Sequence, residues 1–139
     1  MTDQELIRRA LLARERAYTP YSHFQVGAAR LTRTGTVYPG CNIENAAYTP
    51  TNCAERTAFF SAVAQGERDF AAIAIVGGPQ GGALDYTAPC GVCRQVMMEF
   101  CDPDTFRILV ARSPEDYRVF TLRELMPQSF GPADLAKKS

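Results

Sequence analysis

Phe70-Ala71-Ala72-Ile73-Ala74-Ile75-Val76 is the stretch of this sequence that decides the fold. An unbroken apolar run of this length is typical of a strand whose two faces are both covered. Helices are expected on either side of it, over about residues 53–65, ended by Gly66, and residues 91–100, which stop before Pro103. A buried strand between two helices indicates an α/β fold with crossover connections.

The rest of the chain extends this pattern to a mixed sheet. A first helix is expected from Thr2, which has capping-box spacing with Glu5, and its apolar face continues as far as Pro20. Four further strands are predicted at residues 24–31, 37–41, 106–111 and 117–121, with a turn at 33–36, a glycine-rich mobile loop at 77–82 and a short helix at 122–126. We therefore expect one domain, residues 1–139, with a mixed five-stranded sheet flanked by helices in three layers.

Composition excludes several classes of function. Lysines and arginines number fifteen, as do the carboxylates, so the net charge of zero offers no field to hold a nucleic acid. The sequence has no apolar run of the roughly 18 residues that span a membrane, and it opens with an acidic amphipathic segment rather than a signal peptide. We expect a cytoplasmic protein with a small-molecule partner. Five cysteines, an odd number, argue against a secreted disulfide framework.

The motifs that carry chemistry are Cys53-Ala54-Glu55-Arg56 and Pro89-Cys90-Gly91-Val92-Cys93-Arg94. Both fall at the start of a predicted helix, where the helix dipole favours thiolates. Three thiolates leave one position of a tetrahedral zinc ion open, which distinguishes a catalytic zinc from a structural one. Two alternatives are inert buried cysteines and a thioredoxin-like CxxC pair. A third is ligation by His23, the only histidine, which would make a structural Cys₃His site.

Glu55 and the two arginines have roles that follow from this metal site. Glu55 lies two positions after Cys53, so its carboxylate can reach a zinc-bound water and move a proton without binding the metal. The alternative is that Glu55 forms a capping box with Asn52. Arg56 and Arg94 each follow a ligand and can offset the negative charge of three thiolates, although surface salt bridges are the other interpretation.

Four motifs, in order along almost the whole chain, resemble the small three-cysteine cytidine deaminases that act on free nucleosides. The cysteine motifs fit the zinc-deaminase signature of Cys or His, any residue and Glu, followed by Pro-Cys-x-x-Cys. The other three motifs are Tyr21-Ser22-His23-Phe24-Gln25-Val26-Gly27-Ala28-Ala29, Gly40-Cys41-Asn42-Ile43-Glu44-Asn45-Ala46 and Leu125-Met126-Pro127-Gln128-Ser129-Phe130. One departure from the family is the long glycine-rich loop before Pro89.

The resemblance implies roles for five further residues. Phe24 would pack against the pyrimidine, and Asn42 with Glu44 would hydrogen-bond the ribose hydroxyls. Tyr48 and Phe130 would complete a neighbouring subunit's site in a homotetramer. From the residues alone, Phe24 is equally well a core side chain, and Asn42 and Glu44 suit a solvated turn. Cys41 and Cys101 match no ligand and are interpreted as small hydrophobic residues.

The implied reaction is hydrolytic deamination of cytidine and 2'-deoxycytidine in pyrimidine salvage, with one zinc per subunit. Water activated at the zinc adds to C4, Glu55 transfers protons to N3 and to the amino group, and ammonia leaves. Three alternatives stay open. In the first, the enzyme acts on a related aminopyrimidine nucleoside such as blasticidin S. In the second, the protein is a non-catalytic zinc-stabilised interaction module. A polynucleotide editor is the third, disfavoured by the absent basic stripe.

Overall fold

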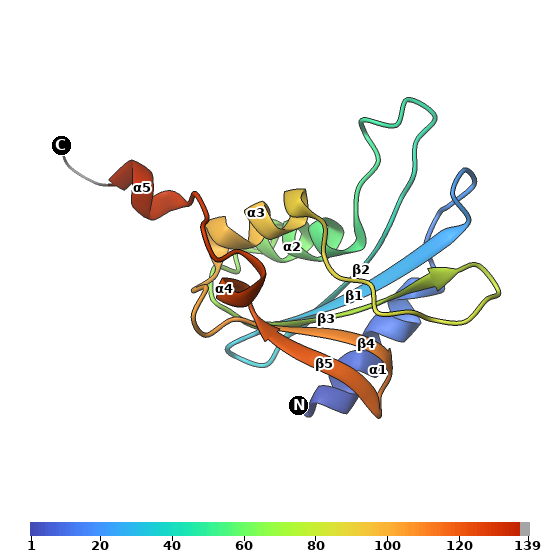
Figure 1. Ribbon diagram of the computed structural model, residues 1–139, viewed down its shortest axis with the longest axis horizontal. Coiled ribbons are helices and arrows are strands. Elements are labelled where there is room, and N and C mark those ends of the chain that lie inside the picture. Colours follow the sequence, from blue (N-terminus) through green and yellow to red (C-terminus); the bar gives the residue numbers. More distant parts are fainter. Residues whose placement is uncertain (137–139) are drawn as a thin grey trace.

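A five-stranded mixed sheet, in the order β2-β1-β3-β4-β5, forms the middle layer of the molecule (Figure 1). The computed structural model describes residues 1–136. The strands are β1 (Phe24–Thr32), β2 (Val37–Cys41), β3 (Phe70–Pro79), β4 (Arg107–Ser113) and β5 (Asp116–Thr121). The helices are α1 (Asp3–Arg14), α2 (Ala54–Ala64), α3 (Gly91–Phe100), α4 (Leu122–Leu125) and α5 (Pro132–Ala136).

Only one neighbouring pair of strands is parallel. β3 runs parallel to β4. β1 is antiparallel to both β2 and β3, and β4 is antiparallel to β5. The parallel pair requires a crossover, and α3 supplies it on the face of the sheet that also carries α2. The predicted α/β class and the mixed five-stranded sheet are therefore confirmed.

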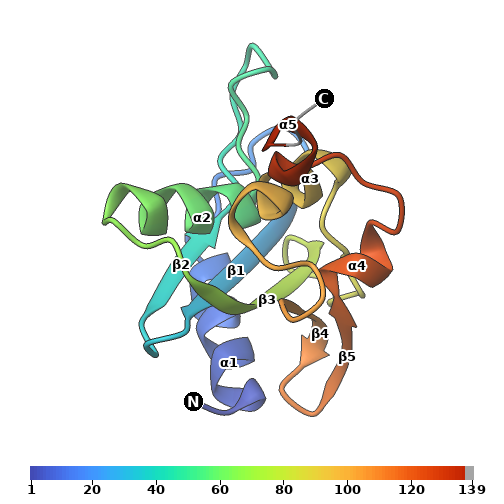
Figure 2. The same cartoon turned by 90° about the vertical axis from the view of Figure 1, so that its left-hand side faces the viewer.

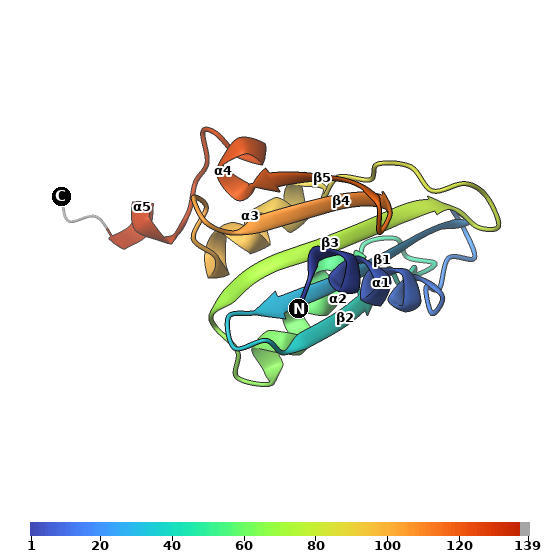
Figure 3. The ribbon, with the colours of Figure 1, turned by 90° about the horizontal axis from the view of Figure 1, so that it is seen from below.

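Two apolar clusters fill the spaces between the layers. One contains α1 residues such as Ile7 and Ala10 packed on Ala74 and Leu109 of the sheet. The other, on the opposite face, gathers side chains of α2, α3 and the sheet around Phe59. Figure 2 and Figure 3 show α1 on one side of the sheet and α2 with α3 side by side on the other. Successive residues of 72–76 point alternately into the two clusters, so both faces of β3 are buried. This is why the run is apolar throughout.

The structure corrects three sequence predictions. The first helix ends at Arg14 rather than continuing to Pro20, because Tyr18 instead pairs with Ile43 and donates its N–H to the Asn42 carbonyl. Gly77 and Gly78, expected in a loop, extend β3 beside β1. The tail after residue 126 contains α5, which the sequence did not suggest.

Most element boundaries agree closely with the predicted ones. α3 covers the predicted residues, and α2 begins one residue later than expected because Cys53 is its N-cap. Gly66 follows α2 with φ of 92°, the left-handed conformation expected after a helix end. No helix within residues 1–136 is long and apolar enough to cross a membrane.

Candidate active site

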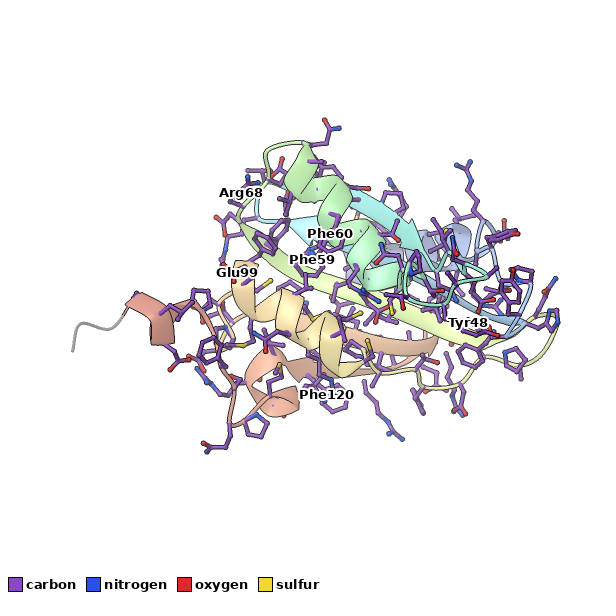
Figure 4. The ribbon with its side chains drawn as sticks, turned by 90° about the horizontal axis from the view of Figure 1, so that it is seen from above. Tyr48, Phe59, Phe60, Arg68, Glu99 and Phe120 are labelled. Atoms are coloured by element: carbon purple, nitrogen blue, oxygen red, sulfur yellow. The ribbon has the colours of Figure 1, made fainter. Side chains whose placement is uncertain are left out.

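The three cysteines of the two motifs meet where α2 and α3 begin. Cys53 is the N-cap of α2 and Cys90 is the N-cap of α3, with Cys93 in the first turn of the same helix. The two helices lie side by side and start at the same end of the sheet, as Figure 4 shows in the view onto them. The backbone N–H groups of both helix starts therefore face one region, and the Cys93 N–H itself points at the Cys90 sulfur at 3.5 Å.

The sulfur atoms have a spacing that fits one zinc ion. The Sγ atoms of Cys53 and Cys90 are 3.8 Å apart, those of Cys90 and Cys93 are 3.4 Å apart, and all three lie within 4.8 Å of one another. Two sulfurs that are each about 2.3 Å from a tetrahedral zinc would be about 3.8 Å apart. In the described part of the chain this is the only group of three or more potential metal ligands, and His23 is outside it. Three ligands of this kind leave a fourth position for water or substrate.

Arg56 supplies positive charge directly to one ligand. Its Nη2 donates to Cys53 Sγ at 3.2 Å, while its Nε is buried without a protein partner. The pKa of Cys53 is lowered to about 5, first by the hydrogen bond from the Cys93 thiol and then by Arg56. The pKa of Cys93 is raised in turn, first by the hydrogen bond of its thiol with Cys53 and then by burial. Such a cluster releases its remaining protons when a cation binds.

Glu55 is the only carboxylate inside the described protein. It is 5% exposed, in the first turn of α2, and burial raises its pKa to about 7. Asn52 does not form the alternative capping box, because its amide donates to Thr57 Oγ1 at 3.2 Å and α2 has no side-chain N-cap bond. A carboxyl that titrates close to neutral pH beside a metal site is suited to accept and return a proton.

A cavity of about 210 Å³ opens beside these groups. Cys53, Glu55 and Cys90 line it together with Asn42. The remaining lining residues come from β1, from the first residue of α2 and from the segments before α2 and α3: Val26, Thr51, Asn52, Ala54, Thr87 and Ala88. A larger cavity of about 570 Å³ at the C-terminal end of α3 contains none of the candidate ligands or Glu55.

Asn42 and Glu44 are both held by hydrogen bonds within the chain. The Asn42 amide accepts from Val26 N and donates to the Phe24 carbonyl, each at 2.9 Å, so it joins β1 to the segment after β2. Glu44 accepts from the backbone N–H groups of Tyr21 and Ser22 and from the Ser22 hydroxyl. These bonds, led by that of the Ser22 hydroxyl, lower the pKa of Glu44.

The predicted substrate residues are divided between two neighbouring cavities. Glu44 lines a second cavity with Tyr21, Ser22, Tyr48 and Thr51, and Thr51 also lines the cavity with Glu55. Phe24 is 36% exposed at the start of β1. The structure therefore brings Asn42 and Glu44 to adjoining spaces rather than into one.

The side chains of the remaining predicted residues bond to backbone carbonyls or are exposed to solvent. Arg94 donates to the carbonyls of Pro89 and Leu125, at 2.8 and 2.9 Å, so it acts on the backbone before Cys90 and not on a thiol. Tyr48 and Phe130 are 72% and 58% exposed, Tyr48 on the loop that rises from the sheet and Phe130 on the tail before α5. Within residues 1–136 neither completes this chain's own cavity beside Glu55.

Sequence reasoning missed Ser22, Thr87 and Ala88. Ser22 was part of a quoted motif, and its hydroxyl just before a predicted strand was the available signal for a contact with Glu44. Thr87 and Ala88 carry no such signal, because small residues in a loop predict no particular neighbour. Their place in the cavity wall depends on how the segment before Cys90 is folded back.

Comparisons with known proteins match this chain along its length. The family model described as the cytidine and deoxycytidylate deaminase zinc-binding region matches residues 1–108. A protein named cytidine deaminase from Sporosarcina psychrophila is 47% identical over 136 residues, covering 98% of this chain and 96% of that protein. Another of the same name from Halalkalibacterium halodurans is 48% identical over 135 residues, covering 97% and 98%.

A solved structure agrees with the fold as well as with the sequence. The crystal structure of cytidine deaminase from Burkholderia pseudomallei is 50% identical with a TM-score of 0.85, covering 94% of this chain and 100% of that one. The matched region is a zinc-binding one, and the three clustered thiols are the set in the described chain that suits this ion. The chain therefore belongs to the cytidine and deoxycytidylate deaminase zinc-binding family.

Proposed function

We propose that this chain is a zinc-dependent hydrolase that deaminates cytidine and 2'-deoxycytidine to uridine and 2'-deoxyuridine. The observation that carries the proposal is the combination of three thiols in zinc spacing with a buried carboxyl, Glu55, beside the same small cavity. A structural zinc site needs four protein ligands and no buried acid. The names of the relatives support the choice of substrate.

The residues of the chain have separate parts in this reaction. Zinc, held by Cys53, Cys90 and Cys93, supplies Lewis-acid activation of water. Glu55 takes a proton from the water and delivers it to N3 of the cytosine ring as the oxygen bonds to C4. The same carboxyl then carries the remaining proton of the added hydroxyl group to the amino group, so that the C4–N bond breaks, ammonia leaves and the C4 carbonyl of uracil remains. Its elevated pKa suits both directions of transfer.

Recognition of the nucleoside is assigned to the residues around the cavity. We assign Asn42 and Glu44 to the ribose hydroxyls and Phe24 to the pyrimidine ring. The fixed orientation of the Asn42 amide and the Glu44 carboxylate supports this role, because groups already held by hydrogen bonds lose little freedom when a ligand arrives. Arg56 is assigned to lower the negative charge of the thiolate set.

The active form is proposed to be a cytoplasmic homotetramer of one-domain subunits, each spanning residues 1–139. Apolar side chains exposed on the α2–α3 face and on the projecting loop and tail support an assembly: Tyr48, Phe60, Val92, Phe130 and Leu135. Of these, Phe60 of α2 and Val92 of α3 line one shared cavity, and exposed apolar side chains that gather in this way are typical of a surface that is covered by a partner. Tyr48 and Phe130 would then reach a neighbour's cavity.

Ultraviolet monitoring of cytidine with the purified protein, with zinc counted per chain, tests the proposal. A panel of cytidine, 2'-deoxycytidine and blasticidin S separates the related aminopyrimidine activities. Zinc without turnover of any cytosine compound would indicate a non-catalytic module instead.

Single-residue variants test the zinc ligands separately. Alanine at Cys53, Cys90 or Cys93 is expected to remove zinc, because each substitution deletes one of only three ligands. The matched variants Cys41→Ala, Cys101→Ala and His23→Ala are expected to keep one zinc per chain. Zinc loss in His23→Ala would contradict the open-site assignment and indicate a structural Cys₃His centre.

A further inference from the structure

Tyr86 lies at the centre of a cluster of charged residues outside the described site. Two guanidinium groups contact its ring, with the Cζ atoms of Arg112 and Arg118 at 4.4 and 4.0 Å from the ring centroid. Its hydroxyl donates to Asp116, which also accepts from Arg112 Nε at 2.7 Å. Arg112 belongs to β4, and Asp116 and Arg118 belong to β5. Tyr86 therefore joins the segment before Cys90 to the β4–β5 hairpin.

The joined segment forms part of the cavity beside Glu55. Thr87 and Ala88, which directly follow Tyr86, line that cavity, and Cys90 follows two residues later. The segment has a second attachment at its other end, where Gln80 donates its N–H to the His23 carbonyl at 2.7 Å. Residues 80–88 thus connect the residue before β1 to the β4–β5 hairpin across one end of the sheet (Figure 3).

Two glycines of β3 let this segment lie close to the sheet. A Cβ at Gly77 would be 2.6 Å from Thr87 Oγ1, and a Cβ at Gly78 would be 2.7 Å from the Ala83 carbonyl oxygen. Asp85 also donates its N–H to the Gly77 carbonyl at 2.9 Å. Thr87 consequently packs directly on the strand, and the position of the cavity wall depends on how firmly the segment is held there.

We propose that Tyr86 is a positioning residue that fixes the Thr87–Ala88 wall of the substrate cavity by clamping residues 80–88 to the β4–β5 hairpin. Arg112, Arg118 and Asp116 form the clamp. The part of the inference that concerns substrate rests on the proposed deaminase function, whereas the clamp itself does not. Tyr86 is not among the residues that line the cavity with Cys53, Glu55 and Cys90, so its effect is on how well a nucleoside fits and not on proton transfer.

The experiment compares Tyr86→Ala and Tyr86→Phe with the control Asp69→Asn. Asp69 is in an exposed ion pair with Arg33, 2.7 Å apart, and is outside the cavity. KM and kcat for cytidine, zinc per chain and amide hydrogen exchange of residues 80–89 are measured for each protein. The phenylalanine variant keeps the ring in contact with the two guanidinium groups and loses only the bond to Asp116.

Tyr86→Ala is expected to raise KM for cytidine roughly tenfold while kcat stays within about twofold, because binding is disturbed and the proton chemistry is not. Zinc content is expected to stay at the wild-type value, and amide exchange is expected to become faster in residues 80–89 alone. Tyr86→Phe is expected to restore most of the lost affinity. Asp69→Asn is expected to match the wild type in all four measurements.

Three results would overturn the proposal. The first is a wild-type KM in Tyr86→Ala, and the second is an increase no larger than that of Asp69→Asn. The third is loss of zinc and kcat together, which would show a general structural role. Failure of the deaminase assignment is separate: the wild-type protein would then leave cytidine unchanged, and unaltered amide exchange in Tyr86→Ala would still refute the clamp.

Discussion

Glu55 and Arg30 are ionisable side chains buried on the same side of the sheet. Their surroundings differ, and so do the expected effects of burying each charge. Glu55 faces a cavity and the thiols, so its raised pKa has a chemical use. Arg30 is 0% exposed among Phe59, Phe70 and Phe106, and its Nε and Nη1 have no hydrogen-bond partner. Its Nη2 only reaches Cys101 Sγ at 3.5 Å. The first buried group is the proposed proton carrier, and the second is expected to lower stability.

Glu55→Gln is expected to keep the fold and the zinc and to lower kcat by about 10² to 10⁴, the usual worth of a general acid or base. The amide has nearly the same shape as the carboxyl and cannot exchange a proton with the substrate. Steady-state kinetics and metal analysis on the same preparation check the prediction. A variant that retains more than about a tenth of the wild-type kcat would exclude Glu55 as the proton carrier.

Arg30→Met is expected to raise the free energy of unfolding by about 1–4 kcal/mol, because an apolar side chain replaces a buried cation with unpartnered nitrogens. Urea unfolding near pH 7 measures the difference. Arg33→Met is the control: Arg33 is exposed and paired with Asp69, so a change of no more than about 0.5 kcal/mol is expected. A destabilised Arg30→Met would show that stacking on the phenylalanine rings outweighs the cost of burying the charge.

The same residue predicts a pH dependence. Burial lowers the pKa of Arg30 to about 8, far below the pKa of an unburied arginine. Between these values the unfolded chain holds a proton that the folded chain has lost, and raising the pH therefore favours folding. The advantage of Arg30→Met over the wild type is expected to shrink between pH 7 and about pH 9.5. A constant difference across this range would show that Arg30 stays charged in the folded protein.

At the scale of elements, the packing of α2 on β2 positions Cys53 and Glu55. Gly40 of β2 lies directly under the first turns of α2, and a Cβ there would be 2.4 Å from the Ala54 carbonyl oxygen and 2.5 Å from the Ala58 nitrogen. Both of these atoms belong to the backbone of the helix, so neither can turn aside. The close approach therefore depends on the absence of a side chain at this one position.

Gly40→Ala is expected to push α2 outward, with a cost of about 1–3 kcal/mol in the free energy of unfolding and weaker zinc binding. Weaker binding follows because Cys53 moves with the helix while Cys90 and Cys93 stay with α3. Thermal unfolding and zinc competition with a chelator measure the two effects. Thr36→Ala, an exposed change just before β2, is the control. Unchanged zinc affinity in Gly40→Ala would show that α2 tilts without moving its first turn.

At the scale of the whole molecule, two segments extend beyond the three layers. They are the loop that carries Tyr48 and the tail that contains Phe130 and α5 (Figure 1). Neither segment is needed to form the sulfur cluster, since the three ligands come from α2, α3 and their N-caps. An exposed aromatic residue on a projecting segment suits a contact with another subunit.

Deletion of residues 126–139 is expected to abolish turnover and to leave zinc bound. All three ligands precede the deletion, whereas the proposed contribution of Phe130 to a neighbour's cavity is lost. Phe130→Ala, which removes one exposed side chain, is expected to lower turnover without lowering the stability of the subunit. Light scattering and the cytidine assay test both variants, and a fully active monomer would refute the shared-site proposal.

How far the sequence predicted the structure depended on the range of the interactions concerned. Local patterns sufficed for the ends of α2 and α3, because N-cap and glycine signals act within a few residues of a helix end. The thiol cluster followed from the same local rules, since two helix starts carry all three ligands. The end of α1 did not follow, because the pairing of Tyr18 with Ile43 joins residues far apart in the chain.

The sequence by itself determined the α/β class, the five strands and the set of groups that fit zinc, because each of these rests on short-range periodicity or on residue type. Only the tertiary structure decided that Arg30 is buried, that Gly40 lies under α2 and that Tyr86 ties the segment before Cys90 to the β4–β5 hairpin. An arginine in a strand pattern indicates a solvent-facing position. It is buried here because α2 covers that face of β1, and which helix covers a given face is settled by contacts between distant segments.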